Sequence, residues 1–136
     1  MTKAMKKTDD PLAVVARKQH GLVTKREALG VLTRGQLQHG LRDRRLEPVR
    51  RGAYRAAGAP ETWQQLLLAV ALTAGAAACA SFRAAAALFE LPDFAADVFE
   101  ITLFGTRPAE IDGVIVHESA VVGPAHVTSR SGIPVT

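Results

Sequence analysis

The stretch that decides the fold runs from Thr24 to Gln36 and reads TKREALGVLTRGQ. It holds two copies of one helix-start signal, Thr24-Lys25-Arg26-Glu27 and Thr33-Arg34-Gly35-Gln36. In each copy the Thr hydroxyl can accept a hydrogen bond from the backbone N–H three residues later. The Glu or Gln side chain can return to the N–H of the Thr, which completes a capping box. Two such boxes separated by Gly30 predict two short helices in succession.

The residues around this stretch predict one more helix and a hairpin. Pro11 suits the first turn of a helix that ends near His20-Gly21. The second capped helix is expected to run to about Asp43, with Leu37 and Leu41 facing inward. Residues 46–55 alternate like strands around Arg50-Arg51-Gly52 and predict a β-hairpin with charged residues near its turn. Three helices and a hairpin predict a winged helix-turn-helix over residues 11–57, after a disordered basic tail at 1–10.

The remainder of the chain predicts a second unit over residues 58–136, which begins with the linker Gly58-Ala59-Pro60. Trp63 to Thr73 is expected to be a helix, and Ser81 is expected to cap another from Phe82 to Leu91. Three strands are expected, at Val98–Leu103, Val114–Glu118 and Ile133–Val135. The predicted fold class is therefore α/β (α+β), a winged helix-turn-helix followed by a small, incomplete α/β unit of two helices and a few strands.

Charge is segregated along the chain. Residues 1–55 hold fourteen Lys or Arg and five Asp or Glu, a net charge of +9. Residues 56–136 hold three and eight, a net charge of −5, and the two parts sum to the total of +4. A basic segment of this kind indicates a polyanionic partner for the first unit and not for the second.

The residues expected to contact double-stranded DNA lie on the capped helices and the hairpin. On the second capped helix, Gln and Arg side chains can pair with base edges in the major groove, and Gly35 allows a close approach. The arginines beside Gly52 suit phosphates or a narrow minor groove, and the other cations suit phosphates. The alternative is an ordinary solvated helix face. The candidate DNA-binding residues are Thr24, Lys25, Arg26, Arg34, Gln36, Gln38, His39, Arg42, Arg44, Arg45, Arg50 and Arg51.

Several other classes of function find little support in the sequence. The single cysteine, Cys79, stands among alanines and is expected to be a small buried residue, which fits a reducing cytoplasm. Residues 62–82 carry no charge, but their polar residues and alanines argue against a membrane span.

Every lysine lies at or before position 25, and no Glu-x-Lys nuclease motif occurs. A metal site at His117, Glu118 and His126 is imaginable, but exposed strand histidines are the simpler interpretation. We expect no enzyme activity, no cofactor and no metal.

The chain resembles the AbiEi-type antitoxins of type IV toxin–antitoxin systems and their actinobacterial relatives. Where many relatives have Ser-His-x-Ser, this chain has Ser81-Phe82-Arg83-Ala84, and Gly40 replaces a better helix former. Relatives continue past the final Gly-Ile-Pro-Val-Thr, which implies that this chain is a fragment or a truncated member. The matching segments are residues 21–24 (GLVT), 33–34 (TR), Leu41, Leu46, 49–54 (VRRGAY), 81–88 (SFRAAAAL) and 131–136 (SGIPVT).

The resemblance implies a cytoplasmic transcriptional repressor that acts on its own promoter, with a following unit that serves antitoxicity or interaction. A second hypothesis makes the winged helix a protein-interaction module that holds a toxin or another subunit without reading DNA. The sheet of the second unit is expected to leave an unpaired edge. Self-association or partner binding through residues 98–136 is therefore expected as well.

Overall fold

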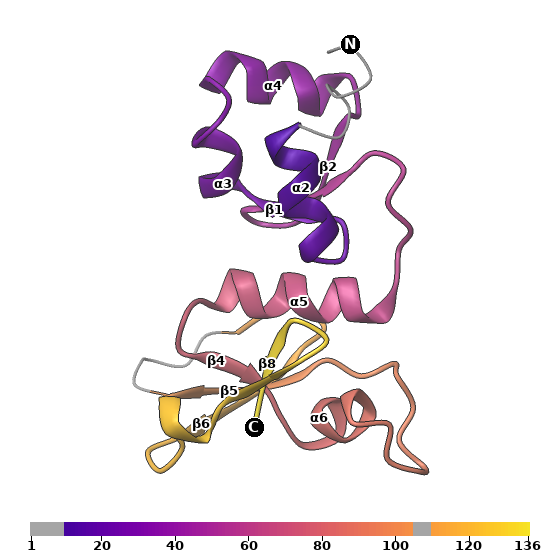
Figure 1. The fold of residues 1–136 in the computed structure, drawn as a ribbon. Coiled ribbons are helices and arrows are strands. Elements are labelled where there is room, and N and C mark those ends of the chain that lie inside the picture. Colours follow the sequence, from indigo (N-terminus) through magenta and orange to yellow (C-terminus); the bar gives the residue numbers. More distant parts are fainter. Residues whose placement is uncertain (1–9, 105–109) are drawn as a thin grey trace. The chain divides into compact units, whose positions relative to one another are not determined.

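The computed structural model describes residues 10–104 and 110–136 (Figure 1). The described residues form two compact units, which divide between Ala69 and Val70. The division falls inside helix α5 (Trp63–Ala74) and not at the predicted linker near residue 58. The tail expected at residues 1–10 lies outside the described residues, apart from Asp10. The Asp10 carboxylate accepts a hydrogen bond from the backbone N–H of Leu12 at 3.0 Å and caps the first described helix.

The first unit combines short helices with one antiparallel sheet. Its elements follow the order α2 (Pro11–Lys18), β1 (Leu22–Thr24), α3 (Lys25–Leu29), α4 (Arg34–Arg42), β2 (Leu46–Arg50) and β3 (Ala53–Ala56). The strand order is β1-β3-β2, so the hairpin of β2 and β3 is joined by the short strand that precedes α3. The helices and the hairpin agree with the sequence prediction, whereas strand β1 was not predicted.

The helices of this unit pack on one side through a small apolar core. Ala16 of α2, Ala28 of α3 and Leu37 of α4 are buried together with Leu46 and Tyr54 of the hairpin. Leu41, the second predicted inward residue of α4, packs against the same core and is partly buried. Gly40 is also buried, but a Cβ at this position would lie in ordinary contact, 3.9 Å from Leu46, so the packing does not require glycine here. Helix α4 continues to Arg42, one residue short of the expected end near Asp43.

The segment after β3 is held close to the end of α2 by a buried glutamine. Gln65 is fully buried, and its side-chain amide donates hydrogen bonds to the carbonyl oxygens of His20 at 2.7 Å and Pro60 at 3.0 Å. The Gln65 carbonyl oxygen accepts from Arg55 at 2.9 Å. Gly21 has φ of +88°, and a Cβ at this position would lie 2.4 Å from the Cβ of Ala59. Glycine is therefore required where these two segments meet.

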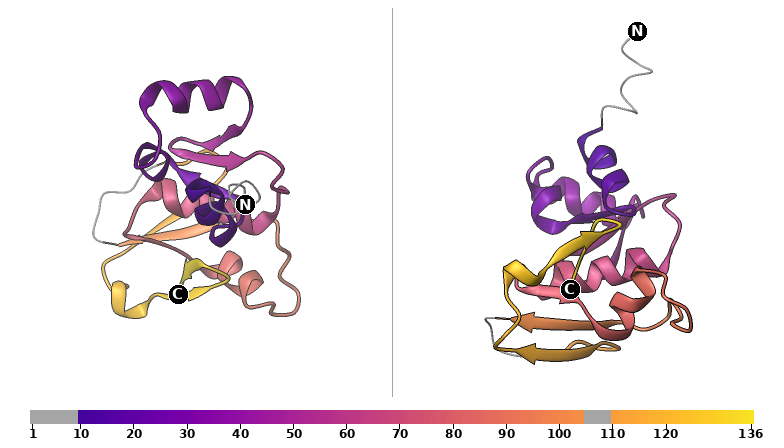
Figure 2. Two further views of the ribbon diagram at one scale, coloured as in Figure 1. Left: turned by 45° about the horizontal axis from the view of Figure 1, so that its top comes forward. Right: turned by 60° about the horizontal axis from the view of Figure 1, so that its bottom comes forward.

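The second unit contains a mixed five-stranded sheet of order β6-β5-β4-β8-β7 (Figures 1 and 2). Strands β5 (Glu100–Phe104) and β6 (Ile115–Ser119) are parallel, as are β4 (Ala78–Ala80) and β8 (Ile133–Val135). The β4–β5 and β7–β8 pairs are antiparallel, with β7 at Thr128–Arg130. The remaining elements are helix α6 (Phe82–Leu88) and a short 3-10 turn η1 (Pro124–His126).

Alternation along β5 separates two environments in this unit. Ile101 and Leu103 are buried with Val70 of α5 and Ala78 of β4, which forms the apolar core. Glu100 and Thr102 point to the opposite face, because neighbouring residues of a strand alternate between faces. Four residues of α6 are also buried, Ala84, Ala85, Ala87 and Leu88.

Four features of the second unit differ from the sequence predictions. Strand β4 was missed, because Ala78-Cys79-Ala80 lacks the β-branched residues that mark strands. Helix α6 ends at Leu88 and not at Leu91, and its first residue Phe82 has φ of +51°. Ser81 occupies the cap position but makes no side-chain capping bond, because its hydroxyl oxygen accepts a hydrogen bond from Thr102 at 2.8 Å. Strand β7 was also not predicted.

Two glycine substitutions should separate backbone strain from steric overlap. Gly58 has φ of +86° and no atom within 4 Å of a built Cβ, so Gly58→Ala should cost only the left-handed strain, ~1–2 kcal/mol. Gly21→Ala should cost ~1–3 kcal/mol more, because it also drives a methyl group into Ala59. Urea unfolding followed by circular dichroism measures both. Equal losses would contradict the close packing of Gly21 against Ala59.

Candidate nucleic-acid interface

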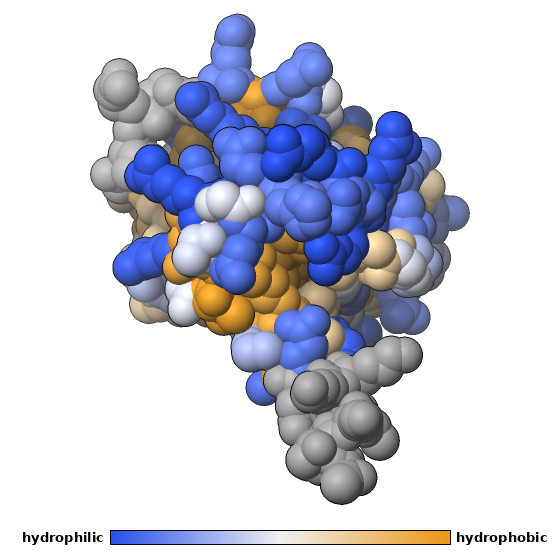
Figure 3. All heavy atoms as spheres, turned by 90° about the horizontal axis from the view of Figure 1, so that it is seen from above, coloured by the Kyte–Doolittle hydropathy of each residue, from blue (hydrophilic) through white to orange (hydrophobic). Residues whose placement is uncertain are grey.

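Helix α4 presents a polar face to solvent. Gly40 and Leu37 are buried on its inner side, and the predicted outward residues are exposed. Figure 3 is turned by 90° from the view of Figure 1, and hydrophilic side chains cover most of the face that it shows. The helix contributes no acidic residue between Arg34 and Arg42. The exposed residues of this face are Arg34, Gly35, Gln36, Gln38, His39 and Arg42.

Both predicted capping boxes are confirmed. The Thr24 hydroxyl accepts from the N–H of Glu27 at 3.0 Å, and the Glu27 carboxylate accepts from the N–H of Thr24 at 2.9 Å. At α4 the same two bonds join Thr33 and Gln36, at 3.1 and 2.9 Å. The side-chain oxygens of Thr24 and Gln36 thus have a local role that sets where each helix begins.

Three of the predicted cations surround one hollow at the tip of the hairpin. This hollow has a volume of about 600 Å³ and is lined by Lys25, Arg50 and Arg51 with Gly52 and Tyr54 among their neighbours. Gly52 is held there because its carbonyl oxygen accepts from the Lys25 N–H at 2.9 Å. The start of α3 and the hairpin turn, separated by about half of the unit's sequence, therefore form one basic surface.

Other predicted residues are engaged at the end of α4. Asp43 lies 3.0 Å from the imidazole of His39 and 3.3 Å from the guanidinium of Arg45. These are exposed pairs, which contribute little to stability but orient the side chains. Arg44 is exposed and has φ of +61°, and Arg26 is exposed on α3. Neither of these two lines the hollow at the hairpin tip.

Gly35 has no structural role that the fold explains. Nothing but the Thr33 hydroxyl, at 4.0 Å, would meet a Cβ built on this residue, and φ is not in the left-handed region. Alanine would suit a helix better, because glycine loses more backbone entropy on folding. The bare backbone at the start of α4 is therefore open to an external partner.

A second polar cluster, in the sheet of the other unit, was not predicted. The Glu100 side chain is only 4% exposed, and its carboxylate lies 3.0 Å from the Arg83 Nε and 2.6 Å from the His117 Nε2. The backbone N–H of Arg83 also donates to this carboxylate, at 3.2 Å. The His117 ring stacks against Phe82 with a centroid separation of 4.4 Å. A charged residue within the apolar run Val98 to Leu103 was the signal in the sequence.

The imagined metal site is not assembled. Among residues 10–104 and 110–136, no group of three His, Cys, Asp or Glu side chains could hold a metal ion. His117 pairs with Glu100, and the His126 Nδ1 accepts from the N–H of Gly123 at 3.1 Å. Cys79 is fully buried as predicted, and burial raises the pKa of its thiol. None of the described helices is long and apolar enough to cross a bilayer.

Comparison of the chain with models of known protein families found no match, and no curated protein matched its sequence. The resemblance to AbiEi-type antitoxins therefore stays a prediction from the quoted residues.

Glu100 should make stability depend on acid pH. Burial alone would raise the pKa of its carboxyl, but hydrogen bonds from His117 and Arg83 outweigh burial and lower the pKa. The carboxyl of Glu100 therefore binds a proton less readily in the folded state than in the unfolded chain. Above the pKa of the unfolded state this difference stabilises the fold, and the stabilisation is lost as the pH falls through the pKa of the folded state. Thermal unfolding between about pH 7 and pH 3 measures the loss.

Glu100→Gln should flatten that part of the pH profile, because the titrating group is gone. Glu90→Gln is the control, since Glu90 is an exposed carboxylate 3.8 Å from Arg130. An acid profile as steep in Glu100→Gln as in the unmodified chain would show that Glu100 does not carry the effect.

Proposed function

We propose that residues 11–57 form a winged helix-turn-helix that binds double-stranded DNA. The order helix, strand, helix, helix, strand, strand supports this, together with the first strand lying beside the last. In such a unit α4 enters the major groove and the β2–β3 hairpin is the wing. The observation that carries the proposal is the basic hollow of Lys25, Arg50 and Arg51 at the wing, in a unit whose helix α4 presents a polar face.

The contacts in the helix assign different parts to its polar residues. Gln36 has its side-chain oxygen in the capping box, and His39 lies against Asp43. Gln38 and Arg42 are exposed, and neither has a side-chain partner among the described residues. Gln38 and Arg42 are therefore the better base readers, by pairing with adenine and guanine edges. Lys25, Arg26, Arg44, Arg50 and Arg51 would contact phosphates.

The biological role that fits this proposal is a transcriptional repressor of the antitoxin type, acting in the cytoplasm. This part rests on the resemblance of the sequence to AbiEi-type antitoxins. We propose no enzyme activity, because neither the sequence nor the described polar clusters suggest a nucleophile with a base. No cofactor or metal is proposed.

A protein-interaction role is the second candidate, and exposed apolar residues in the second unit favour it. Phe82 is 62% exposed, Leu91 50% and Phe94 44%. Apolar side chains of this size at the surface often mark a site for a partner. The expected interaction surface at residues 98–136 would then extend to residues 82–94, and its occupant would be a toxin or a second copy of the chain.

DNA binding should depend steeply on salt. If about five phosphates are neutralised, the logarithm of affinity should fall against the logarithm of salt concentration with a slope near −4 to −5. The full chain is titrated against a duplex by fluorescence anisotropy at several salt concentrations. A flat response would reject the DNA proposal and leave the interaction role.

The basic hollow gives this experiment a matched control. Arg50→Gln with Arg51→Gln should reduce the magnitude of the slope by about two and weaken binding to every sequence. Arg17→Gln with Lys18→Gln removes the same charge from the end of α2. Leu22, which follows α2 closely in the chain, pairs with Arg55, whereas Thr24 pairs with Ala53 beside the hairpin turn. The end of α2 therefore lies at the opposite end of β1 from the wing. Equal effects of the two double variants would contradict binding at the wing.

Gly35 and Gly40 test whether α4 approaches the DNA. Both lie in one helix, and both changes to alanine should stabilise it by up to ~1 kcal/mol. A Cβ at Gly40 would lie in ordinary contact, 3.9 Å from Leu46. Gly35→Ala should weaken DNA binding about tenfold by holding the backbone off the phosphates, whereas Gly40→Ala should not. Unchanged affinity in a stabilised Gly35→Ala would argue against close approach by α4.

A further inference from the structure

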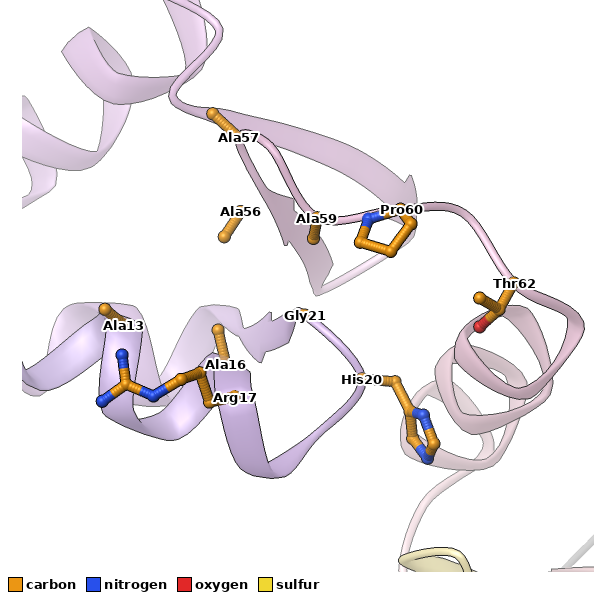
Figure 4. Close-up of a pocket in the computed structure, with 10 residues that line it drawn as sticks. All are labelled: Ala13, Ala16, Arg17, His20, Gly21, Ala56, Ala57, Ala59, Pro60 and Thr62. Carbon is orange, nitrogen blue, oxygen red and sulfur yellow. The ribbon is translucent and has the colours of Figure 1, made fainter.

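An apolar hollow lies between α2 and the segment that follows β3, away from the basic hollow. Its volume is about 440 Å³, within the range of roughly 300–1,000 Å³ that small-molecule sites occupy. Ala13 and Ala16 of α2 face Ala56 and Ala59 across it (Figure 4). The opposed methyl groups leave space that larger side chains would have filled.

The walls of this hollow are fixed by hydrogen bonds. The carbonyl oxygen of Gly21 accepts from the N–H of Ala56 at 2.9 Å, and the N–H of Ala59 donates to the Ala56 carbonyl at 3.1 Å. The Gln65 side-chain amide donates to the carbonyl oxygens of both His20 and Pro60, and both of these residues line the hollow. A hollow with such supports exists before any ligand arrives, which lowers the entropic cost of binding.

A cationic side chain also lines this hollow. Arg17 lines the hollow, and among residues 10–104 and 110–136 it has no acidic partner. No acidic side chain belongs to the described lining. A ligand with an apolar body and one anionic head therefore complements the walls and the guanidinium together.

The hollow continues into a second one that borders α4. Ala13, Ala56 and Ala57 line both, and the second has a volume of about 670 Å³. Its other walls are apolar at Leu12, Leu32 and Leu46 and polar at Asp10, Gln36, His39 and Arg45. The combined groove can take an elongated body that begins at Arg17.

We infer that this groove binds an amphipathic organic anion, an aryl or alkyl chain that carries one carboxylate or sulfonate. The anionic head lies at Arg17, and the body lies against Ala13 and Ala16 of α2. This inference does not depend on DNA binding, because it rests on the groove and its charge alone.

Fluorescence titration of the full chain tests the inference with anilinonaphthalene sulfonate and its neutral analogue N-phenylnaphthylamine. One sulfonate probe should bind per chain, more tightly than the neutral probe. Arg17→Gln should weaken the sulfonate about tenfold, the size of one charge-assisted hydrogen bond, and leave the neutral probe unchanged. Lys18→Gln is the matched control, since Lys18 is an exposed cation next in α2 that does not line the hollow.

Ala13→Leu should weaken both probes, because the larger side chain fills the space that the two hollows share. Circular dichroism checks that each variant is folded. If Ala13→Leu does not fold, the comparison of Arg17→Gln with the unmodified chain tests the inference alone. Equal affinities for the two probes, an unchanged sulfonate affinity in Arg17→Gln, or several probes bound per chain would overturn the inference.

Discussion

The pairing of β1 with β3 is the constraint on which the first unit depends. Thr24 ends β1 and also caps α3, so the strand register fixes where the helix pair begins. The same register brings Gly52 of the hairpin turn to the N–H of Lys25. Without this pairing the hairpin would be an isolated two-stranded ribbon, which is marginal in water. The three cations of the basic hollow would then have no common surface.

In helix α4 the residue at position 35 suits the proposed DNA contact better than it suits the stability of the helix. Its capping box supplies a well-defined start, and its inner side has the buried residues that a helix of nine residues needs. Yet Gly35 sits in its first turn with space around it. Glycine there weakens the helix and leaves the backbone uncovered. A sequence optimised for the fold alone would favour alanine at this position.

The second unit stabilises a buried charge by surrounding it with donors. Glu100 would be costly beneath α6 if it stood alone, because burial disfavours a carboxylate. Arg83 and His117 come from two different elements and meet it from the solvent side. Phe82 stacks on His117 with a backbone of positive φ, so the first residue of α6 is held by this cluster and not by helix propensity. The cluster replaces the capping role that Ser81 does not fill.

The sequence by itself determined the elements that depend on neighbours in the chain. The two capping boxes, the hairpin around Gly52 and the strand at Ile133 are encoded by spacing and turn chemistry within a few residues. Only the tertiary structure decided which distant groups meet. Strand β4 is made of small residues that form a strand because β5 and β8 pair with it. Lys25 meets Arg50 and Arg51, and Glu100 meets Arg83 and His117, through sheet register. The groove beside Arg17 likewise arises where α2 and the segment after β3 are brought together, and no local pattern specifies such a distance.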